Sequence, residues 1–184
     1  MTGQATVLLV LAAAIAAPGV AGAQAIDPKR SRIEFDLRTR WGPLVQGTFP
    51  RYDGRVETLS DGRRRVHLRL SAAAVEVAGS PRYTAVARGP QLFDAARHPW
   101  VEFVSDPYSP ELARTGGALP GRLTLRGVGR AERFELAAAP CARPGRDCDV
   151  LATGLVSREN YGLSGWRWAV ADRVRFRLHV RYAD

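Results

Sequence analysis

The chain has 184 residues, of which 46% are hydrophobic and 24% charged, so it can bury a substantial core and is neither a disordered nor a collagen-like chain. Its formal net charge is +9, and because Lys29 is the only lysine, the other 26 of its 27 basic residues are arginines. A nucleic-acid-binding protein usually gathers its basic residues on one helix or patch, whereas these arginines are spread over the chain at strand-like alternate positions. We therefore expect one domain with charged outer faces and no nucleic-acid partner.

The first residues have the pattern of a secretory signal peptide. Val7 to Ala17 is an apolar run that is too short to span a bilayer but typical of the core of such a leader. Ala21-Gly22-Ala23 follows as an A-x-A cleavage site, which divides the chain into a signal peptide, residues 1–23, and a mature domain, residues 24–184. A glutamine rather than a cysteine follows the cut, which argues against a lipoprotein anchor. We expect a periplasmic or secreted protein with no transmembrane segment in its mature form.

Apolar and charged residues alternate along most of the mature chain, which is typical of half-buried strands. Near the end, for example, Val174, Phe176 and Leu178 alternate with arginines. About nine such segments are joined mostly by short turns that contain Gly, Pro or Asp, and these turns predict antiparallel hairpins. The segments are residues 33–37, 44–49, 54–58, 66–70, 100–105, 123–125, 134–138, 150–157 and 174–182.

One longer connection, residues 71–99, interrupts the strands. Ser80 followed by Pro81 is a helix start, with the serine as N-cap, and predicts a short helix over residues 81–88. We expect a further helical turn within residues 90–96. Strands in chain order with apolar inner faces favour an all-β, antiparallel up-and-down barrel with a short helical insertion. Such a barrel can either fill its own lumen or hold one small apolar ligand, and the sequence leaves both open.

Successive loops of an up-and-down barrel alternate between its two ends. This rule places at one end Trp41-Gly42-Pro43, Asp61-Gly62, residues 106–118 and the loop that contains both cysteines. It places at the other end Tyr52, the helical insertion, residues 126–129 and residues 158–172. The helical end then has more aromatic residues, so we expect the entrance or a lid there. The alternative is that these aromatic residues plug and stabilise that end.

The two cysteines, Cys141 and Cys148, flank a turn-rich stretch, and an exported pair so close together is most simply an intrachain disulfide. A metal site would need two further ligands, and a redox motif has two residues between its cysteines rather than six. We therefore expect a structural disulfide.

Several short segments, in their order and spacing, resemble the YceI-like family. They are residues 31–35, 45–49, 93–94, 98–105, 121–128, 154–158, 161–163 and 172–174. The resemblance implies a lipocalin-like antiparallel barrel, periplasmic or secreted, whose lumen holds a long amphiphile such as a polyisoprenoid; it implies no catalytic mechanism. The chain departs from the common family pattern in carrying Cys141 and Cys148 in a loop, and in having Trp41-Gly42-Pro43 where many members have a histidine-containing turn.

Our first hypothesis is an exported lipid-binding protein that transports, stores or senses a polyisoprenoid or similar amphiphile. Burial of an apolar tail would contribute about 25 cal/mol per Å². Arg126 and Arg130 are candidates to bind an anionic headgroup. The apolar residues expected to contact the ligand, each with core packing as its alternative, are Phe35, Leu37, Val45, Phe49, Leu68, Leu70, Tyr83, Phe93, Phe103, Leu123, Phe134, Trp166, Phe176 and Leu178.

The second hypothesis is a self-filled barrel that acts as an envelope interaction module, binding a partner or anionic lipid headgroups through its basic outer surface. Enzyme functions gain no support from the motifs. The run Gly162-Leu163-Ser164-Gly165 is not a G-x-S-x-G nucleophile elbow, and His67, His98 and His179 lack metal-ligand spacing. We expect no catalysis, no metal and no cofactor other than a bound amphiphile.

Overall fold

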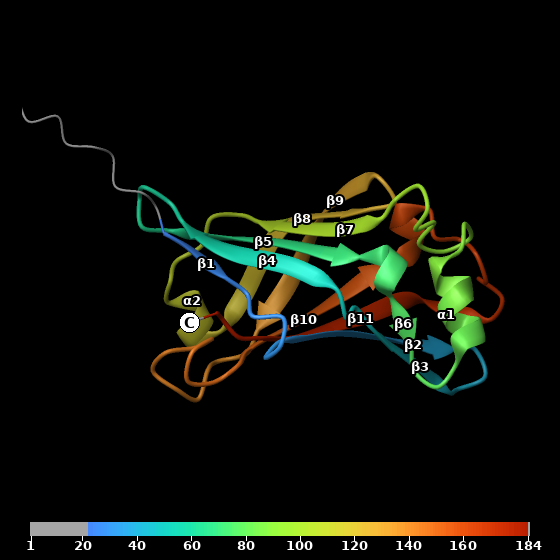
Figure 1. Cartoon of the computed structure of the whole chain (residues 1–184), viewed down its shortest axis with the longest axis horizontal. Coiled ribbons are helices and arrows are strands. Elements are labelled where there is room, and N and C mark those ends of the chain that lie inside the picture. Colours follow the sequence, from blue (N-terminus) through green and yellow to red (C-terminus); the bar gives the residue numbers. More distant parts are fainter. Residues whose placement is uncertain (1–21, 184) are drawn as a thin grey trace, which may run out of the picture.

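The computed structural model describes residues 22–183, which form one curled antiparallel sheet of eleven strands, a half-barrel with two short α-helices and two 3-10 turns (Figure 1). The predicted antiparallel β-barrel fold with a helical insertion is confirmed. The strands are β1 (Ala23–Ala25), β2 (Arg32–Thr39), β3 (Leu44–Thr48), β4 (Tyr52–Thr58), β5 (Arg64–Ser71), β6 (Glu76–Val77), β7 (Trp100–Ser105), β8 (Gly117–Leu125), β9 (Val128–Leu136), β10 (Val150–Ser157) and β11 (Val170–Val180). The helical elements are η1 (Ala72–Ala74), α1 (Pro81–Arg88), α2 (Leu112–Thr115) and η2 (Arg158–Tyr161).

The alternation in the sequence produces the inner and outer faces of this sheet. Every second residue of β10 is buried from Val150 to Val156, and the residues between them are exposed. On the neighbouring β11, Phe176, Leu178 and Val180 are buried. Because side chains of a strand point alternately to its two faces, each strand contributes one apolar row to the lumen and one polar row to the solvent.

The strand order follows the chain from β4 to β11, with β6 left out, and departs from it in placing β1 beside β4 and β2, β3 and β6 after β11. It runs β1-β4-β5-β7-β8-β9-β10-β11-β2-β3-β6, and all neighbours that pair are antiparallel. Counting reversals from β4 round to β3 shows that β3 and β4 run in the same direction and do not pair. The chain therefore continues, without turning back, through Pro50, which has no N–H to donate to a ladder.

This continuation makes one expectation wrong. The rule of alternating loop ends assumed a reversal between β3 and β4, and without it Trp41-Gly42-Pro43 lies at the helical end rather than opposite to it. The Trp41 ring lies 5.8 Å from that of Trp168, which precedes β11. Tyr52, also expected at the helical end, is the first residue of β4 and lies beside the segment after β1, since its hydroxyl donates a hydrogen bond to the carbonyl of Ser31 at 2.8 Å.

The helical end contains α1, which begins as predicted. Ser80 Oγ accepts a hydrogen bond from the backbone N–H of Tyr83 at 3.2 Å, and Pro81 occupies the first turn. The further helical turn expected within residues 90–96 is replaced by separate hydrogen-bonded turns. Asp94 has a φ of 48°, in the left-handed region, and so a right-handed helix cannot continue through it.

The opposite end contains α2 and the Cys141–Cys148 disulfide, which is confirmed. The loop that this bond closes packs on the last residues of the chain, since the N–H of Tyr182 donates to the carbonyl of Gly145 at 2.8 Å. Gly145 has a φ of 84°, and an added Cβ would clash with the Tyr182 ring. We call this end the disulfide end.

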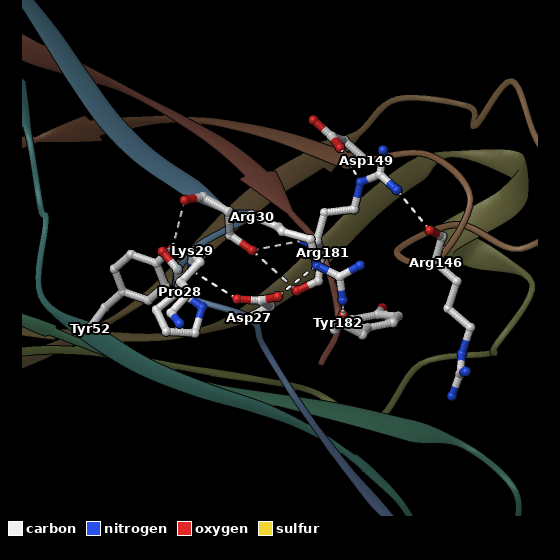
Figure 2. A network of polar contacts seen from close by, with 10 residues as sticks. Asp27, Pro28, Lys29, Arg30, Tyr52, Arg146, Asp149, Arg181 and Tyr182 are labelled. Atoms are coloured by element: carbon white, nitrogen blue, oxygen red, sulfur yellow. Dashed lines mark hydrogen bonds and ion pairs between the residues drawn. The ribbon is translucent and has the colours of Figure 1, made fainter. Parts of the chain in front are cut away.

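A network of charged groups ties the segment after β1 to the chain's last strand (Figure 2). Arg30 donates to the carbonyl of Tyr182 at 2.7 Å and pairs with Asp27 at 2.6 Å. Arg181 pairs with Asp149 and donates to the carbonyl of Arg146 at 2.7 Å. Backbone hydrogen bonds make the same connection: the N–H of Ile26 donates to the carbonyl of Gly54 and the N–H of Asp27 to the carbonyl of Arg181, both at 2.8 Å. The network therefore adds side-chain contacts where the segment after β1 joins β4 to the end of the chain, at the disulfide end.

We predict that the disulfide stabilises the folded protein and has no effect on ligand uptake at the helical end. The double substitution Cys141→Ser/Cys148→Ser should lower the free energy of unfolding by about 2 to 3 kcal/mol, because it frees a short loop in the unfolded chain. Urea denaturation of both proteins measures this difference. Uptake of an apolar ligand at the helical end should be unchanged in the same variant, and a loss of uptake would contradict the placement of the loop far from the cavity described next.

Candidate functional site: an apolar cavity at the helical end

The lumen of the half-barrel contains two apolar cavities. The larger has a volume of about 240 Å³ and lies at the helical end, where β2, β3, α1 and the loop before β11 meet; we call it the mouth cavity. The smaller has a volume of about 80 Å³, lies towards the disulfide end and is lined by β5, β7, β8, β9, β10 and β11; we call it the inner cavity. The lumen is therefore neither empty nor fully self-filled.

A layer of phenylalanine rings separates the two cavities. Phe176 lines both of them. Its ring centroid lies 6.4 Å from that of Phe35 and 6.5 Å from that of Phe49, and Phe49 lies 5.7 Å from Phe93 in an edge-to-face arrangement. Offset and edge-to-face contacts of this kind stabilise such a layer beyond the area that it buries. A ligand tail that enters the mouth cavity therefore meets Phe176 at its inner end.

Aromatic side chains from three separate elements form the opening of the mouth cavity. Trp41 comes from the β2–β3 turn, Tyr83 from α1, and Trp166 and Trp168 from the loop before β11. Trp166 lies 5.6 Å from Trp168, and Trp168 lies 5.8 Å from Trp41. Trp41, Tyr83 and Trp168 line the cavity and are also 68%, 54% and 65% exposed. The apolar wall thus runs without interruption from the lumen to the solvent.

The structure divides the predicted ligand-binding residues between the two cavities. Those on the mouth cavity are Phe35, Leu37, Val45, Tyr83, Phe93, Trp166 and Phe176. Those on the inner cavity are Leu68, Leu70, Phe103, Leu123, Phe134, Phe176 and Leu178. Phe49 is 1% exposed and lines neither, so here it packs within the layer between the cavities.

The two predicted headgroup residues lie beside the helical end and outside the cavity wall. Arg126, in the β8–β9 turn, donates to the carbonyl of Gly162 at 2.9 Å, and Arg130 donates to the carbonyl of Asn160 at 3.4 Å. Neither lines the mouth cavity. Both side chains therefore bind carbonyls in η2 or directly after it, and their role as headgroup ligands stays a prediction.

Arg158 is a site residue that the sequence reasoning missed. It is 5% exposed and lines the mouth cavity. Its guanidinium donates to the carbonyls of Ala171, Leu163 and Gly165 at 2.9, 2.9 and 2.8 Å. Burial lowers the pKa of this guanidinium, although arginine remains charged in proteins at neutral pH. The alternation of β10 could have located it, because Arg158 follows Val156 on the inward side.

Arg158 holds the loop that carries two of the mouth tryptophans. Its backbone acceptors are distributed over both ends of residues 163–171. In the same loop Trp166 has a φ of 62°, a strained value for a non-glycine residue, and its carbonyl accepts from the N–H groups of Ala169 and Val170. An added Cβ on Gly165 would clash with the carbonyl of Gln91, so the loop also packs closely on the turns after α1. These contacts hold the loop before β11 in place at the opening of the cavity.

The mouth cavity can bind apolar groups and offers few groups for chemistry. Among its lining residues the polar or ionisable side chains besides indole are Thr39, Tyr83 and Arg158, and none is a carboxylate, histidine, serine or cysteine. Thr39 Oγ1 is buried and has no hydrogen-bond partner in the part of the chain that the structure describes. Within residues 22–183 no group of three or more His, Cys, Asp and Glu side chains is placed to bind a metal ion.

The comparisons with known proteins agree with this architecture. A family model described as the YceI-like domain matches residues 24–182. BcnA of Burkholderia cenocepacia has 18% sequence identity and a TM-score of 0.69, with 86% of this chain and 99% of that one covered. A polyisoprenoid-binding domain of Saccharophagus degradans, implicated in plant cell wall breakdown, has 13% identity and a TM-score of 0.65, with coverage of 86% and 97%.

A third structure is more distant. The YceI protein of Campylobacter jejuni has 14% identity and a TM-score of 0.58, with 75% of this chain and 84% of that one covered. At these identities the three structures establish the fold. No curated protein sequence matches this chain. None of the helices within residues 22–183 has the length and apolar character to cross a bilayer.

We predict that Phe176 sets the length of chain that the lumen accepts. Phe176→Ala should join the two cavities, at a cost of about 3 to 5 kcal/mol in stability, and should move the preference in a series of saturated fatty acids towards longer chains. Native mass spectrometry of protein incubated with the series measures the preference. Val75→Ala is the control, since Val75 is fully buried and lines neither cavity. An unchanged preference in folded Phe176→Ala would contradict the prediction.

We also predict that Arg158 stabilises the mouth loop. Arg158→Lys should lower the free energy of unfolding by about 2 kcal/mol or more, because a single ammonium cannot satisfy three carbonyls that a guanidinium fork reaches. Limited proteolysis should cut within residues 162–169 faster than in the unchanged protein. Arg167→Lys, in the same loop but exposed and paired with Glu159 at 2.9 Å, is the control and should change stability by less than about 1 kcal/mol. Equal effects of the two substitutions would exclude this role.

Proposed function

The chain belongs to the YceI-like family, and from that premise we propose that it binds a polyisoprenoid or similar long amphiphile in the lumen of its half-barrel, for transport, storage or sensing. The observation that carries this proposal is the mouth cavity of about 240 Å³, which is apolar almost throughout and open at the helical end. The Saccharophagus degradans domain with the same fold is described as polyisoprenoid-binding, which supports the same class of ligand.

The cavity favours a ligand that enters tail first. Its walls bear phenylalanine, leucine, valine and tryptophan side chains, and each square ångström of apolar ligand surface that they cover contributes about 25 cal/mol. The polar head would then remain near the tryptophans of the opening, within reach of solvent. Arg126 and Arg130 would contact it only if the head extends over η2, which they brace.

The length of the ligand depends on Phe176. Small-molecule sites usually have volumes of roughly 300 to 1,000 Å³, and the mouth cavity alone is slightly smaller. We propose that a short tail occupies the mouth cavity with Phe176 in place. A long polyisoprenoid chain would enter the inner cavity after the Phe176 ring rotates aside.

We further propose that the protein is exported and acts in the periplasm or outside the cell. The proposed signal peptide lies almost wholly outside the described residues, and the proposed cut after Ala23 falls within β1. The Cys141–Cys148 disulfide supports an oxidising compartment. The lining of the mouth cavity supports binding without catalysis, because no nucleophile and base meet there.

The test is to identify what the protein holds. We expect native mass spectrometry of mature protein purified from its own cell envelope, followed by solvent extraction, to release a stoichiometric apolar species whose homologues differ by five-carbon units. Val45→Trp, which places an indole in the mouth cavity, should reduce occupancy about tenfold, the factor that corresponds to 1.4 kcal/mol. Gln46→Trp is the matched control, because the next residue of β3 is exposed on the outer face.

Two results would count against the proposal. One is equal occupancy in Val45→Trp and Gln46→Trp, which would place the ligand elsewhere. The other is an empty protein that also fails to take up added polyprenols. That outcome would favour the second hypothesis, in which the barrel acts through outward arginines such as Arg173, Arg175 and Arg177 of β11.

A further inference from the structure

We propose that the mouth of the cavity is a docking surface for an anionic phospholipid bilayer. The surface consists of the exposed aromatic residues Trp41, Tyr83 and Trp168 and the neighbouring arginines Arg38, Arg40 and Arg82. This inference rests on the proposed function, because a protein that binds an amphiphile has a reason to approach a membrane. It adds which partner the protein meets and which face of the protein meets it.

The exposure of these aromatic rings is the first argument. Large aromatic side chains stabilise a fold most when they are buried, yet Trp41 and Trp168 are about two-thirds exposed at the helical end. Trp100 provides the contrast. It lies on the outer wall at the start of β7, is 38% exposed, and is covered by the guanidinium of Arg69 at 4.4 Å. Within residues 22–183 no guanidinium covers a mouth ring in this way, and these rings contact one another at the opening of the cavity.

The loops that carry the two tryptophans are joined to each other. The N–H of Arg40 donates to the carbonyl of Ala169 at 2.9 Å, and Arg40 Nε donates to the carbonyl of Arg167 at 2.9 Å. Arg158 fixes the second loop from inside. The rings are therefore held in an exposed position by polar contacts within the loops, so that little ordering is required when the surface meets a partner.

The charges around the mouth have one predominant sign. Arg40 immediately precedes Trp41, Arg38 lies two residues before Arg40, and Arg82 precedes Tyr83; all three arginines are exposed. Among the residues that the structure describes, no carboxylate forms an ion pair with any of them, whereas Glu159 is already paired with Arg167. No acidic residue lines the mouth cavity. An aromatic tip within a basic rim therefore complements a negatively charged partner.

A bilayer surface fits this combination better than a protein does. Tryptophan and tyrosine favour the boundary between acyl chains and headgroups, where one end of the ring is apolar and the other wet. Basic residues near an anionic leaflet each add attraction there. An amphiphile dissolved in that leaflet would move from lipid to lumen along the aromatic wall, without exposing its tail to water.

Vesicle sedimentation tests the proposal. The mature protein should bind vesicles of equimolar phosphatidylcholine and phosphatidylglycerol, bind phosphatidylcholine alone more weakly, and be released by salt. Trp41→Ser/Trp168→Ser should lower the partition coefficient at least about tenfold, through lost apolar contact. Arg38→Gln/Arg82→Gln should lower it about fivefold per charge on the anionic vesicles only.

The controls are exposed residues of the same types on the barrel wall. Trp100→Ser and Arg133→Gln/Arg175→Gln should bind vesicles as the unchanged protein does. Quenching by brominated lipids should persist in Trp100→Ser and decline in Trp41→Ser/Trp168→Ser. All substituted residues of the mouth are exposed, and an unchanged thermal unfolding midpoint verifies that each variant is folded.

Two outcomes would overturn the inference. One is an unchanged protein that does not bind the anionic vesicles. The other is vesicle binding that the mouth variants retain and the wall variants lose, which would assign the contact to the outer wall. Extraction of the bound ligand separates these failures from failure of the proposed function: a protein that carries an amphiphile but ignores vesicles refutes the docking surface alone.

Discussion

The packing of phenylalanine rings in the middle of the lumen is the interaction on which the rest of this structure depends. Phe35 and Phe176 come from paired strands, Phe49 directly follows β3, and Phe93 lies in the turns after α1. The rings therefore fix the first strands, the last strand and the helical insertion against one another. The same layer divides the lumen into two cavities, because the rings occupy its centre and Phe176 lines both sides.

Much of this fold could be predicted from local sequence patterns, because local geometry causes them. Alternation predicted the strands, since a pleated strand presents every second side chain to the core. Ser80 and Pro81 predicted the start of α1, since a serine cap and a proline in the first turn meet the needs of a helix N-terminus. The disulfide followed from the spacing of Cys141 and Cys148. Each of these features depends on residues that are close in the chain.

The features that could not be predicted depend on residues that are distant in the chain. Pro50 would suit a turn as well as it suits the straight passage from β3 to β4, and only the pairing of β3 with β2 and of β4 with β5 decides between them. The difference between Phe49, which fills the lumen, and Phe35, which lines a cavity, arises from how four rings share one space. Arg158 was overlooked because a buried arginine is unusual; its cost is offset here by main-chain carbonyls that only the folded loop supplies.

The two edges of the sheet have a consequence for how the protein behaves among its own copies. A curled sheet that does not close on itself normally presents unpaired backbone groups to neighbouring chains, which can extend it by edge-to-edge pairing. Here the last strands in the sheet order are β1, with three residues, and β6, with two. The outer side of β1 is also occupied, because the carbonyl of Ala25 accepts a hydrogen bond from the N–H of Ala183 at 2.8 Å and Ile26 bridges Tyr182. At the other side of the sheet, the two residues of β6 offer too few donors and acceptors to template an incoming strand. The sheet therefore discourages the edge-to-edge association between copies that an open sheet invites.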